Sequence, residues 1–180
     1  MPHAGLQAPH YDRTGLAGLL PGVAASLGVS RYDASDTVPM RPARRAVVVL
    51  VDGLGYELVR RRGGHAPFLR SLLPAAYRIT AGFPSTTATS MGTFGTGLPP
   101  GAHGVLGFVT AVPGEGRLLN HTQWTDDPDP RAWQSRRTVF EQAAAAGIEV
   151  TAAGPYAYAR SGLTDAAYRG ARYRGAVSPG

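Results

Sequence analysis

Hydrophobic positions near the start of the chain recur at helical spacing, at Leu16, Leu19, Leu20, Val23 and Leu27. This spacing predicts a helix that packs through one face and ends near Val29, with Pro21 close to its start. Residues 30–45 are rich in Pro, Asp and Arg, a composition typical of a surface connection. The first 45 residues are therefore expected to form an N-terminal helix and a linker.

A continuous run of apolar residues, mostly valine, follows at 46–51. Such a run is typical of a strand that is covered on both faces. It ends abruptly at Asp52, where Gly53 and Gly55 allow the backbone to turn sharply. We expect a central strand of a sheet here.

Two shorter patterns lead from this strand to a polar segment. Residues 66–73 are helical in pattern, and residues 77–81 predict a short strand. Residues 83–104, which are rich in Thr, Ser and Gly, come next and are typical of turns and of a helix start.

The last third of the chain predicts a helix followed by a strand. Thr138 and Glu141 have the spacing of a capping box, which opens a helix through Ala146 that Gly147 can end. Residues 148–153 then predict another buried strand. This alternation favours an α/β fold, with a mostly parallel sheet sandwiched by helices.

The composition is that of a single globular domain. A chain of 180 residues with 43% hydrophobic content can bury its own core. No run approaches the roughly 18 apolar residues of a membrane span, and no secretory signal opens the chain, so we expect a cytoplasmic protein without membrane contact. The absence of cysteine excludes a disulfide framework, a thiolate metal site and a cysteine nucleophile.

The formal charge of +6 comes from arginine, because all 18 Lys and Arg positions are Arg. Without lysine, a Walker phosphate loop and a Schiff-base mechanism are excluded. The cluster at Arg60, Arg61 and Arg62 is not interleaved with aromatic residues, so nucleic acid is not expected as a partner.

Asp52 is the first candidate for chemistry. Ligands of open α/β sheets bind beyond the carboxyl ends of the strands, and Asp52 comes directly after one. The alternative is that Asp52 caps the next helix. Dinucleotide binding is disfavoured, because Leu58 takes the place of the third glycine that should follow Gly53 and Gly55.

The segment 83–97 is the second candidate, with five Thr and two Ser residues. It suits a turn that feeds a helix N-terminus, where free N–H groups and the helix dipole attract phosphate. A hydroxyl there would be well placed as a nucleophile. The alternative is a tightly packed helix of small residues with capping hydroxyls.

These two segments occur in a recognisable order, VVVLVDGLG at 47–55 and FPSTTATSMGTFGTGLPPGAHGV at 83–105. Thr87 stands nine residues before Thr96, which opens a Thr-Gly pair, and His103 opens the His-Gly pair at the end of the loop. In this order and spacing the chain resembles the nucleotide pyrophosphatase/phosphodiesterase group of the alkaline phosphatase superfamily.

The resemblance implies a metal-dependent phosphohydrolase of the phosphodiesterase or nucleotide pyrophosphatase type. Asp52 would bind one of two divalent metal ions, with zinc the expected metal. Thr87 would bind metal and attack phosphorus, forming a phosphothreonine, and a metal could lower the pKa of its hydroxyl. Thr86 is the alternative nucleophile, separated from Thr87 only by spacing. Small phosphate esters or nucleotides are the implied substrates.

The chain also departs from the family pattern. Eukaryotic phosphodiesterases of the group have Asn three residues after the nucleophile, where this chain has Ser90, and the C/S-x-P-x-R pattern of sulfatases is absent. The downstream Asp and His ligands of the family are not matched. We interpret His103 as lying outside the metal set, and His121, ahead of a hairpin-like region, as structural or surface. A solvated acidic loop is expected at Asp126, Asp127 and Asp129.

The resemblance covers about the first half of the family's catalytic domain. Residues 46–180 are therefore expected to be the N-terminal part of such a domain, in an apparently truncated chain whose sheet would have an open edge. Two functions follow from the sequence. One is an active phosphohydrolase, and the alternative is a catalytically incomplete fragment that keeps only a phosphate-binding half-site.

Overall fold

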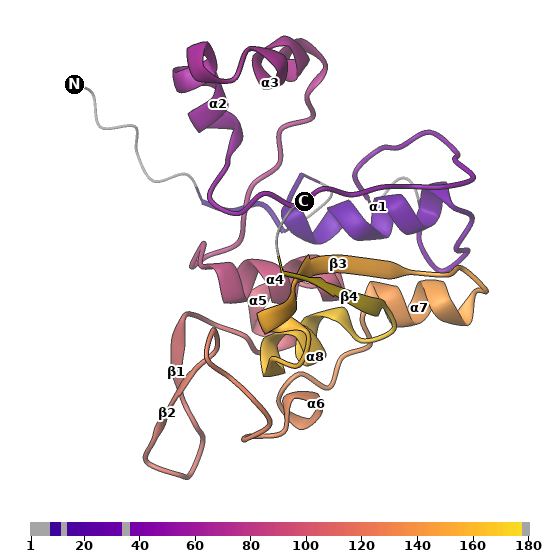
Figure 1. Cartoon of the computed structure of the whole chain (residues 1–180). Coiled ribbons are helices and arrows are strands. Elements are labelled where there is room, and N and C mark those ends of the chain that lie inside the picture. The colour runs from indigo at the N-terminus through magenta and orange to yellow at the C-terminus, as the bar shows by residue number, and fades with distance from the viewer. Residues whose placement is uncertain (1–7, 12–13, 34–36, 178–180) are drawn as a thin grey trace.

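The computed structural model describes residues 8–11, 14–33 and 37–177. Parts of the expected N-terminal segment and linker, and the last three residues of the expected catalytic part, lie outside the described residues. Helices and strands both form, which confirms the α/β class (Figure 1). Within the described ranges the strands make only two-stranded sheets, so the larger, mostly parallel sheet expected from the sequence is not formed.

The α-helices are α1 (Leu19–Ser26), α2 (Tyr56–Arg62), α3 (Pro67–Leu72), α4 (Thr87–Thr96), α5 (Pro100–His103), α6 (Pro130–Trp133), α7 (Val139–Ala145) and α8 (Gly162–Tyr168). Short 3-10 helices are η1 (Leu16–Gly18), η2 (Gly63–His65), η3 (Leu73–Ala75) and η4 (Tyr156–Tyr158). The strands are β1 (Val109–Ala111), β2 (Leu118–Asn120), β3 (Thr151–Pro155) and β4 (Arg172–Ala176). Strands β1 and β2 pair antiparallel as a hairpin, and β3 and β4 pair parallel across α8.

Helix α4 lies at the centre of the body, between α1 on one side and α8 on the other (Figure 1). It contributes to both hydrophobic clusters of the core. The α1 cluster consists of Leu20, Ala24, Val29, Phe94, Val139 and Ala143. The hairpin cluster consists of Ala88, Val105, Val112, Leu119, Trp124, Leu163 and Ala166. One helix therefore ties the N-terminal helix, the hairpin and the C-terminal helices together.

The close contact between α4 and α8 depends on a glycine. A Cβ added at Gly95 would lie 1.8 Å from the carbonyl oxygen of Ala167, a distance that no side chain can occupy. Since both helices bury residues at this contact, the absence of a side chain at Gly95 sets how closely they approach.

Two of the helices were predicted closely from sequence. The apolar spacing near the N-terminus becomes η1 and α1, with Pro21 as the third residue of α1, where its missing N–H costs nothing. The capping box opens α7, with the Thr138 hydroxyl and the Glu141 carboxylate each bonding the other residue's N–H. Gly147 follows α7 with a positive φ of 83°.

The prediction of a buried strand at 46–51 is wrong. These residues form no strand and are all exposed, with Val47 89% exposed. A valine-rich run becomes a central strand only where neighbours bond its backbone and cover both faces. No backbone hydrogen bond joins 46–50 to another residue within the described ranges.

Two other strand predictions need correction. The expected buried strand at 148–153 begins later, at Thr151, and its residues are exposed or half-buried in alternation. The expected strand at 77–81 is reduced to one parallel bridge between Thr80 and Gly15.

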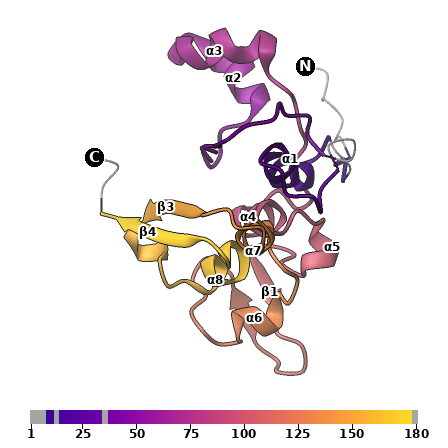
Figure 2. The ribbon, with the colours of Figure 1, turned by 90° about the vertical axis from the view of Figure 1, so that its right-hand side faces the viewer.

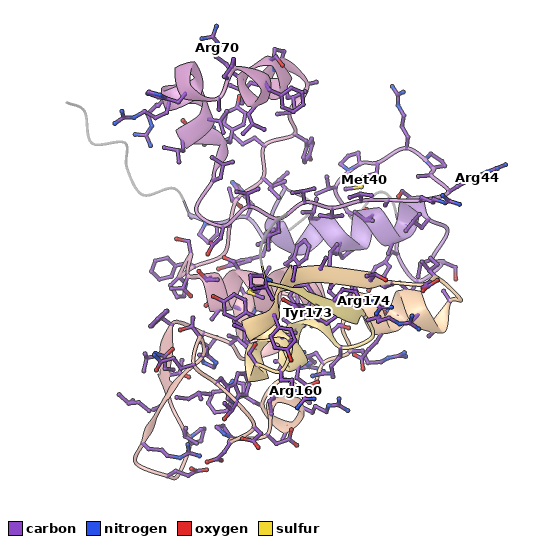
Figure 3. All side chains as sticks on the ribbon, viewed as in Figure 1. Met40, Arg44, Arg70, Arg160, Tyr173 and Arg174 are labelled. Carbon is purple, nitrogen blue, oxygen red and sulfur yellow. The ribbon has the colours of Figure 1, made fainter. Side chains whose placement is uncertain are left out.

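Helices α2 and α3 form an arm that stands away from the body (Figures 1 and 2). Helix α3 falls within the predicted helix at 66–73. Among the residues of α2 and α3, none is buried, and Phe68 is 71% exposed. Arg70 on this arm and Arg44 on the linker extend away from the molecule (Figure 3).

We predict that Gly95→Ala destabilises the fold by at least about 1–3 kcal/mol, because α4 and α8 must separate to admit the new methyl group. Gly101→Ala is the matched control, since a Cβ there meets nothing within 4 Å. Urea unfolding of both variants measures the difference. Equal midpoints for the two variants would show that the α4–α8 contact does not constrain the fold.

Candidate active site

Asp52 lies at the end of the exposed run, directly before a turn. Gly53 has a positive φ of 70°, which redirects the chain toward α2. The N-cap of α2 is Gly55, and no side chain caps that helix end. Asp52 therefore does not cap the next helix, and the alternative role for Asp52 that the sequence allowed is wrong.

Helix α4 begins immediately after Thr86. Thr86 is its N-cap, and the Thr86 hydroxyl accepts a hydrogen bond from the Thr89 N–H at 3.4 Å. The same hydroxyl donates to the Thr89 hydroxyl at 3.0 Å. The side chain of Thr86 is thus engaged within its own helix end, as is usual for an N-cap threonine.

Thr87 is the first helical residue, and its side chain leaves the helix. The Thr87 hydroxyl donates to Oδ2 of Asp52 at 3.0 Å, although the two residues are 35 positions apart in sequence. The contact is open to solvent. The structure therefore brings together the two residues that the sequence singled out, and it directs only one of the two candidate threonines toward the carboxylate.

The rest of α4 is packed in the core. Of the two interpretations of segment 83–97, the open helix N-terminus therefore applies to the start of α4 and the packed helix to the rest of it. Ala88, Thr89, Gly92 and the residues from Thr93 to Thr96 are buried. The Thr96 hydroxyl donates back to the Gly92 carbonyl at 2.6 Å. Phe94 and mostly small residues fill the buried length of the helix, while the hydroxyl of its first residue makes a contact that is open to solvent.

His103, which we interpreted from the sequence as lying outside the metal set, is buried in the core. Its Nδ1 accepts the Val105 N–H at 3.2 Å, so Nε2 carries the proton and donates to the Thr93 hydroxyl at 2.9 Å. Burial lowers the pKa of His103 to about 4. The ring is therefore neutral near pH 7.

His121 is a second buried histidine, and it is structural. Its ring meets Trp124 and Trp133 edge to face, at centroid distances of 5.3 and 5.6 Å. Nε2 lies 2.9 Å from the Thr110 hydroxyl, and burial lowers the pKa of the ring. The β1–β2 hairpin precedes His121, whereas the sequence suggested a hairpin after it.

The acidic loop is exposed, as expected, and two of its three carboxylates have structural partners. Asp127 pairs with Arg117 at 2.9 Å, and Asp129 caps α6 through the Arg131 N–H. Across the described ranges, no three His, Asp or Glu side chains gather as a metal-binding group.

Asp52 and Thr87 each supply an oxygen donor at the candidate site. Carboxylate and hydroxyl oxygens are suitable ligands for a divalent ion, and a separation of 3.0 Å allows both to contact the same ion. They therefore fit as two ligands of one metal ion. They do not fit the two-ion centre that the resemblance implied, because no group of three or more His, Asp or Glu side chains forms within the described residues.

A cavity of about 690 Å³ lies elsewhere, around α6 and α8. It contains the ion pair of Arg131 and Asp165 but neither Asp52 nor Thr87. A smaller cavity of about 330 Å³ is lined by Leu54, Gly55 and Tyr56, which follow Asp52 closely in the chain. We assign the candidate site from the hydrogen bond between Asp52 and Thr87, because chemistry requires reactive groups rather than volume.

The two threonines should differ in their effect on stability. Thr86→Ala removes an N-cap and should cost about 1 kcal/mol, whereas Thr86→Ser keeps the cap. Thr87→Ala removes a solvent-exposed hydrogen bond and should cost less than about 0.5 kcal/mol. Urea unfolding checks both values, and a larger loss for Thr87→Ala than for Thr86→Ala would contradict these assignments.

Stability should also fall on acidification because of His103. Its pKa is about 4 when folded, against an ordinary 6.5, so the unfolded chain binds more protons between these pH values. The free energy of unfolding then decreases as the pH falls through this window, by up to roughly 3 kcal/mol. His103→Gln should weaken this pH dependence of stability. Thr93→Val, which keeps His103, should lower stability at every pH and leave the pH dependence in place. Urea titrations at pH 4 to 7 test this, and an unchanged slope in His103→Gln would refute it.

Comparison with known protein families matches residues 46–176 to the family described as type I phosphodiesterase / nucleotide pyrophosphatase. The match spans more than half of the chain and includes Asp52 and Thr87. No curated protein and no solved structure matches significantly. In the described residues no helix is both long and apolar enough to cross a bilayer. The chain belongs to the type I phosphodiesterase/nucleotide pyrophosphatase family.

Proposed function

We propose that this chain acts in the hydrolysis of phosphate esters or pyrophosphates, with Thr87 as the nucleophile. Its family consists of hydrolases that act on such bonds. The observation that carries the proposal is the hydrogen bond from the Thr87 hydroxyl to the Asp52 carboxylate, at 3.0 Å. Small phosphate esters and nucleotides are the substrates that suit this assignment.

The position of Thr87 in α4 favours it over Thr86. As the first residue of a ten-residue helix, Thr87 lies where backbone N–H groups lack intrahelical partners and the helix dipole is positive. Both features attract the phosphoryl oxygens of a substrate. The Thr86 hydroxyl is already bonded to Thr89 and would have to release the helix cap to react.

The reaction begins when the Thr87 oxygen attacks phosphorus. A bond forms between that oxygen and phosphorus while the bond to the leaving group breaks, which gives a phosphothreonine. The hydroxyl proton passes to Asp52, which is already its hydrogen-bond acceptor. A water molecule then attacks the phosphothreonine: its oxygen bonds to phosphorus as the bond between phosphorus and the Thr87 oxygen breaks, which releases phosphate or a phosphate monoester. Asp52 returns its proton to the Thr87 oxygen, and the proton that the water loses goes to solvent and balances the one that the leaving group takes up.

A threonine hydroxyl needs activation at neutral pH, and Asp52 supplies only part of it. Divalent metal ions are general in this family, and one bound by Asp52 and Thr87 would lower the hydroxyl pKa and neutralise phosphoryl charge. Zinc is the metal we propose. Additional ligands would have to join these two oxygens, because the described part of the chain forms no cluster of three or more His, Asp or Glu side chains.

The small number of ligands favours a second candidate function. With two oxygen donors and an open helix N-terminus, the site could bind phosphate without turning over an ester. In that case Thr87 would contact the anion as a hydrogen-bond donor. The two candidates differ in turnover, and both use the same residues.

Hydrolysis of p-nitrophenyl phosphodiester and monoester by the purified chain, with added zinc, tests the proposal. Thr87→Ala should lose on the order of a thousand-fold or more in rate, because it lacks the nucleophile. Thr87→Ser should keep most of the activity, and Thr86→Ser is the matched control. Asp52→Asn should also be slow, since the amide cannot take the proton.

The outcomes separate the two candidates. Full activity of Thr87→Ala would overturn the assignment of the nucleophile. No turnover by any variant, together with inorganic phosphate binding that weakens in Thr87→Ala, would establish the second candidate.

A further inference from the structure

We propose that His103 is a positioning residue for Thr87. Its ring joins the middle of α4 to the loop after α5 and so fixes where the first turn of α4 meets Asp52. The inference rests on the proposed function for the role of Thr87, while the mechanical role of His103 rests on the contacts described next.

Both nitrogens of the His103 ring are occupied, and by different segments. Nδ1 accepts from the Val105 N–H, and Nε2 donates to the hydroxyl of Thr93 on α4. The side chain is only 2% exposed, so water does not compete for either nitrogen. One planar group therefore connects the helix to the loop, and its tautomer is set by the backbone donor.

The ring also lies against the backbone of α4. A Cβ added at Gly92 would lie 2.7 Å from Cε1 and 2.8 Å from Nδ1 of His103. Only glycine admits the ring at this distance. Contact at Gly92 and the hydrogen bond at Thr93 restrict both sliding and rotation of the helix, because each fixes a different point on its surface.

A second connection leads from the ring to the start of α4. Val105, whose N–H is bonded to Nδ1, packs in the hairpin cluster with Ala88. Both residues are fully buried, and Ala88 directly follows Thr87 in the helix. The loop itself is tethered, since the Trp133 indole N–H donates to the Gly104 carbonyl at 3.2 Å.

The other half of the candidate site has no comparable support. Asp52 follows the exposed run 46–51, whose first five residues make no backbone hydrogen bonds within the described ranges. The geometry of the site therefore depends on how firmly α4 holds Thr87 in place. A change that lets α4 shift should lengthen the distance between Thr87 and Asp52 even where the fold survives.

His121 provides a matched control within the same chain. It is also fully buried, and its Nε2 also lies 2.9 Å from a threonine hydroxyl, that of Thr110. That hydroxyl is on β1 of the hairpin, and no hydrogen bond joins His121 to α4. Replacing His121 therefore removes a buried ring whose hydrogen bond is to the hairpin and not to α4, although its Nδ1, unlike that of His103, has no hydrogen-bond partner.

The test is amide hydrogen exchange at the first turn of α4, at Thr89 and Ser90, compared with the hairpin. His103→Asn keeps a hydrogen-bond acceptor for the Val105 N–H and loses the donor to the Thr93 hydroxyl. It should speed exchange at the Thr89 and Ser90 amides about tenfold more than in the hairpin. His103→Gln restores a donor to Thr93 and should recover much of the protection. His121→Gln should show the reverse pattern, with faster exchange in the hairpin.

The proposal would be overturned if the His103 variants sped up exchange equally in α4 and in the hairpin, by the amount that their loss of global stability explains. It would also be overturned if His121→Gln sped up exchange in α4 as much as the His103 variants do. Should His103→Asn fail to fold, Thr93→Val removes only the helix side of the contact and should give the same pattern. Exchange does not depend on turnover, so it separates this inference from the proposed function. Where turnover is present, His103→Asn should lower kcat more than it changes KM.

Discussion

The close packing of α4 is the constraint on which the rest of the structure depends. Gly92 admits the His103 ring, Gly95 admits the α8 backbone, and Phe94 fills the α1 cluster between them. Side chains at either glycine would displace a neighbouring element by several tenths of an ångström or more, which a well-packed core resists. The same helix carries Thr87 at its open end. Its buried residues thus secure the framework, and the Thr87 hydroxyl makes a contact that is open to solvent.

Signals confined to a few neighbouring residues were interpreted correctly from the sequence. The capping box before α7 and the apolar spacing of α1 specify structure locally, so no distant partner is needed to predict them. The run at 46–51 is different, because its burial depends on partner strands that a pattern of valines does not identify. For the same reason the two-stranded sheets could not be predicted.

The candidate site was predictable only in part. Asp52 and Thr87 stood out by their order and spacing, but their hydrogen bond depends on how the chain folds between them. The difference between Thr86 and Thr87 follows from where α4 begins, and neighbouring threonines in the sequence do not reveal that boundary. The connection through His103 could not be predicted, because it requires the tertiary contact with Gly92.

The exposed run at 46–51 also bears on how the chain behaves in concentrated solution. An unpaired, valine-rich segment can template cross-β association with other chains. Charged residues adjoin it at both ends, Arg44 and Arg45 before it and Asp52 after it. Such flanking charges act as gatekeepers, since stacking identical segments would bring like charges together. Asp52 therefore has a second consequence beyond its bond to Thr87: its charge opposes self-assembly of the segment that precedes it.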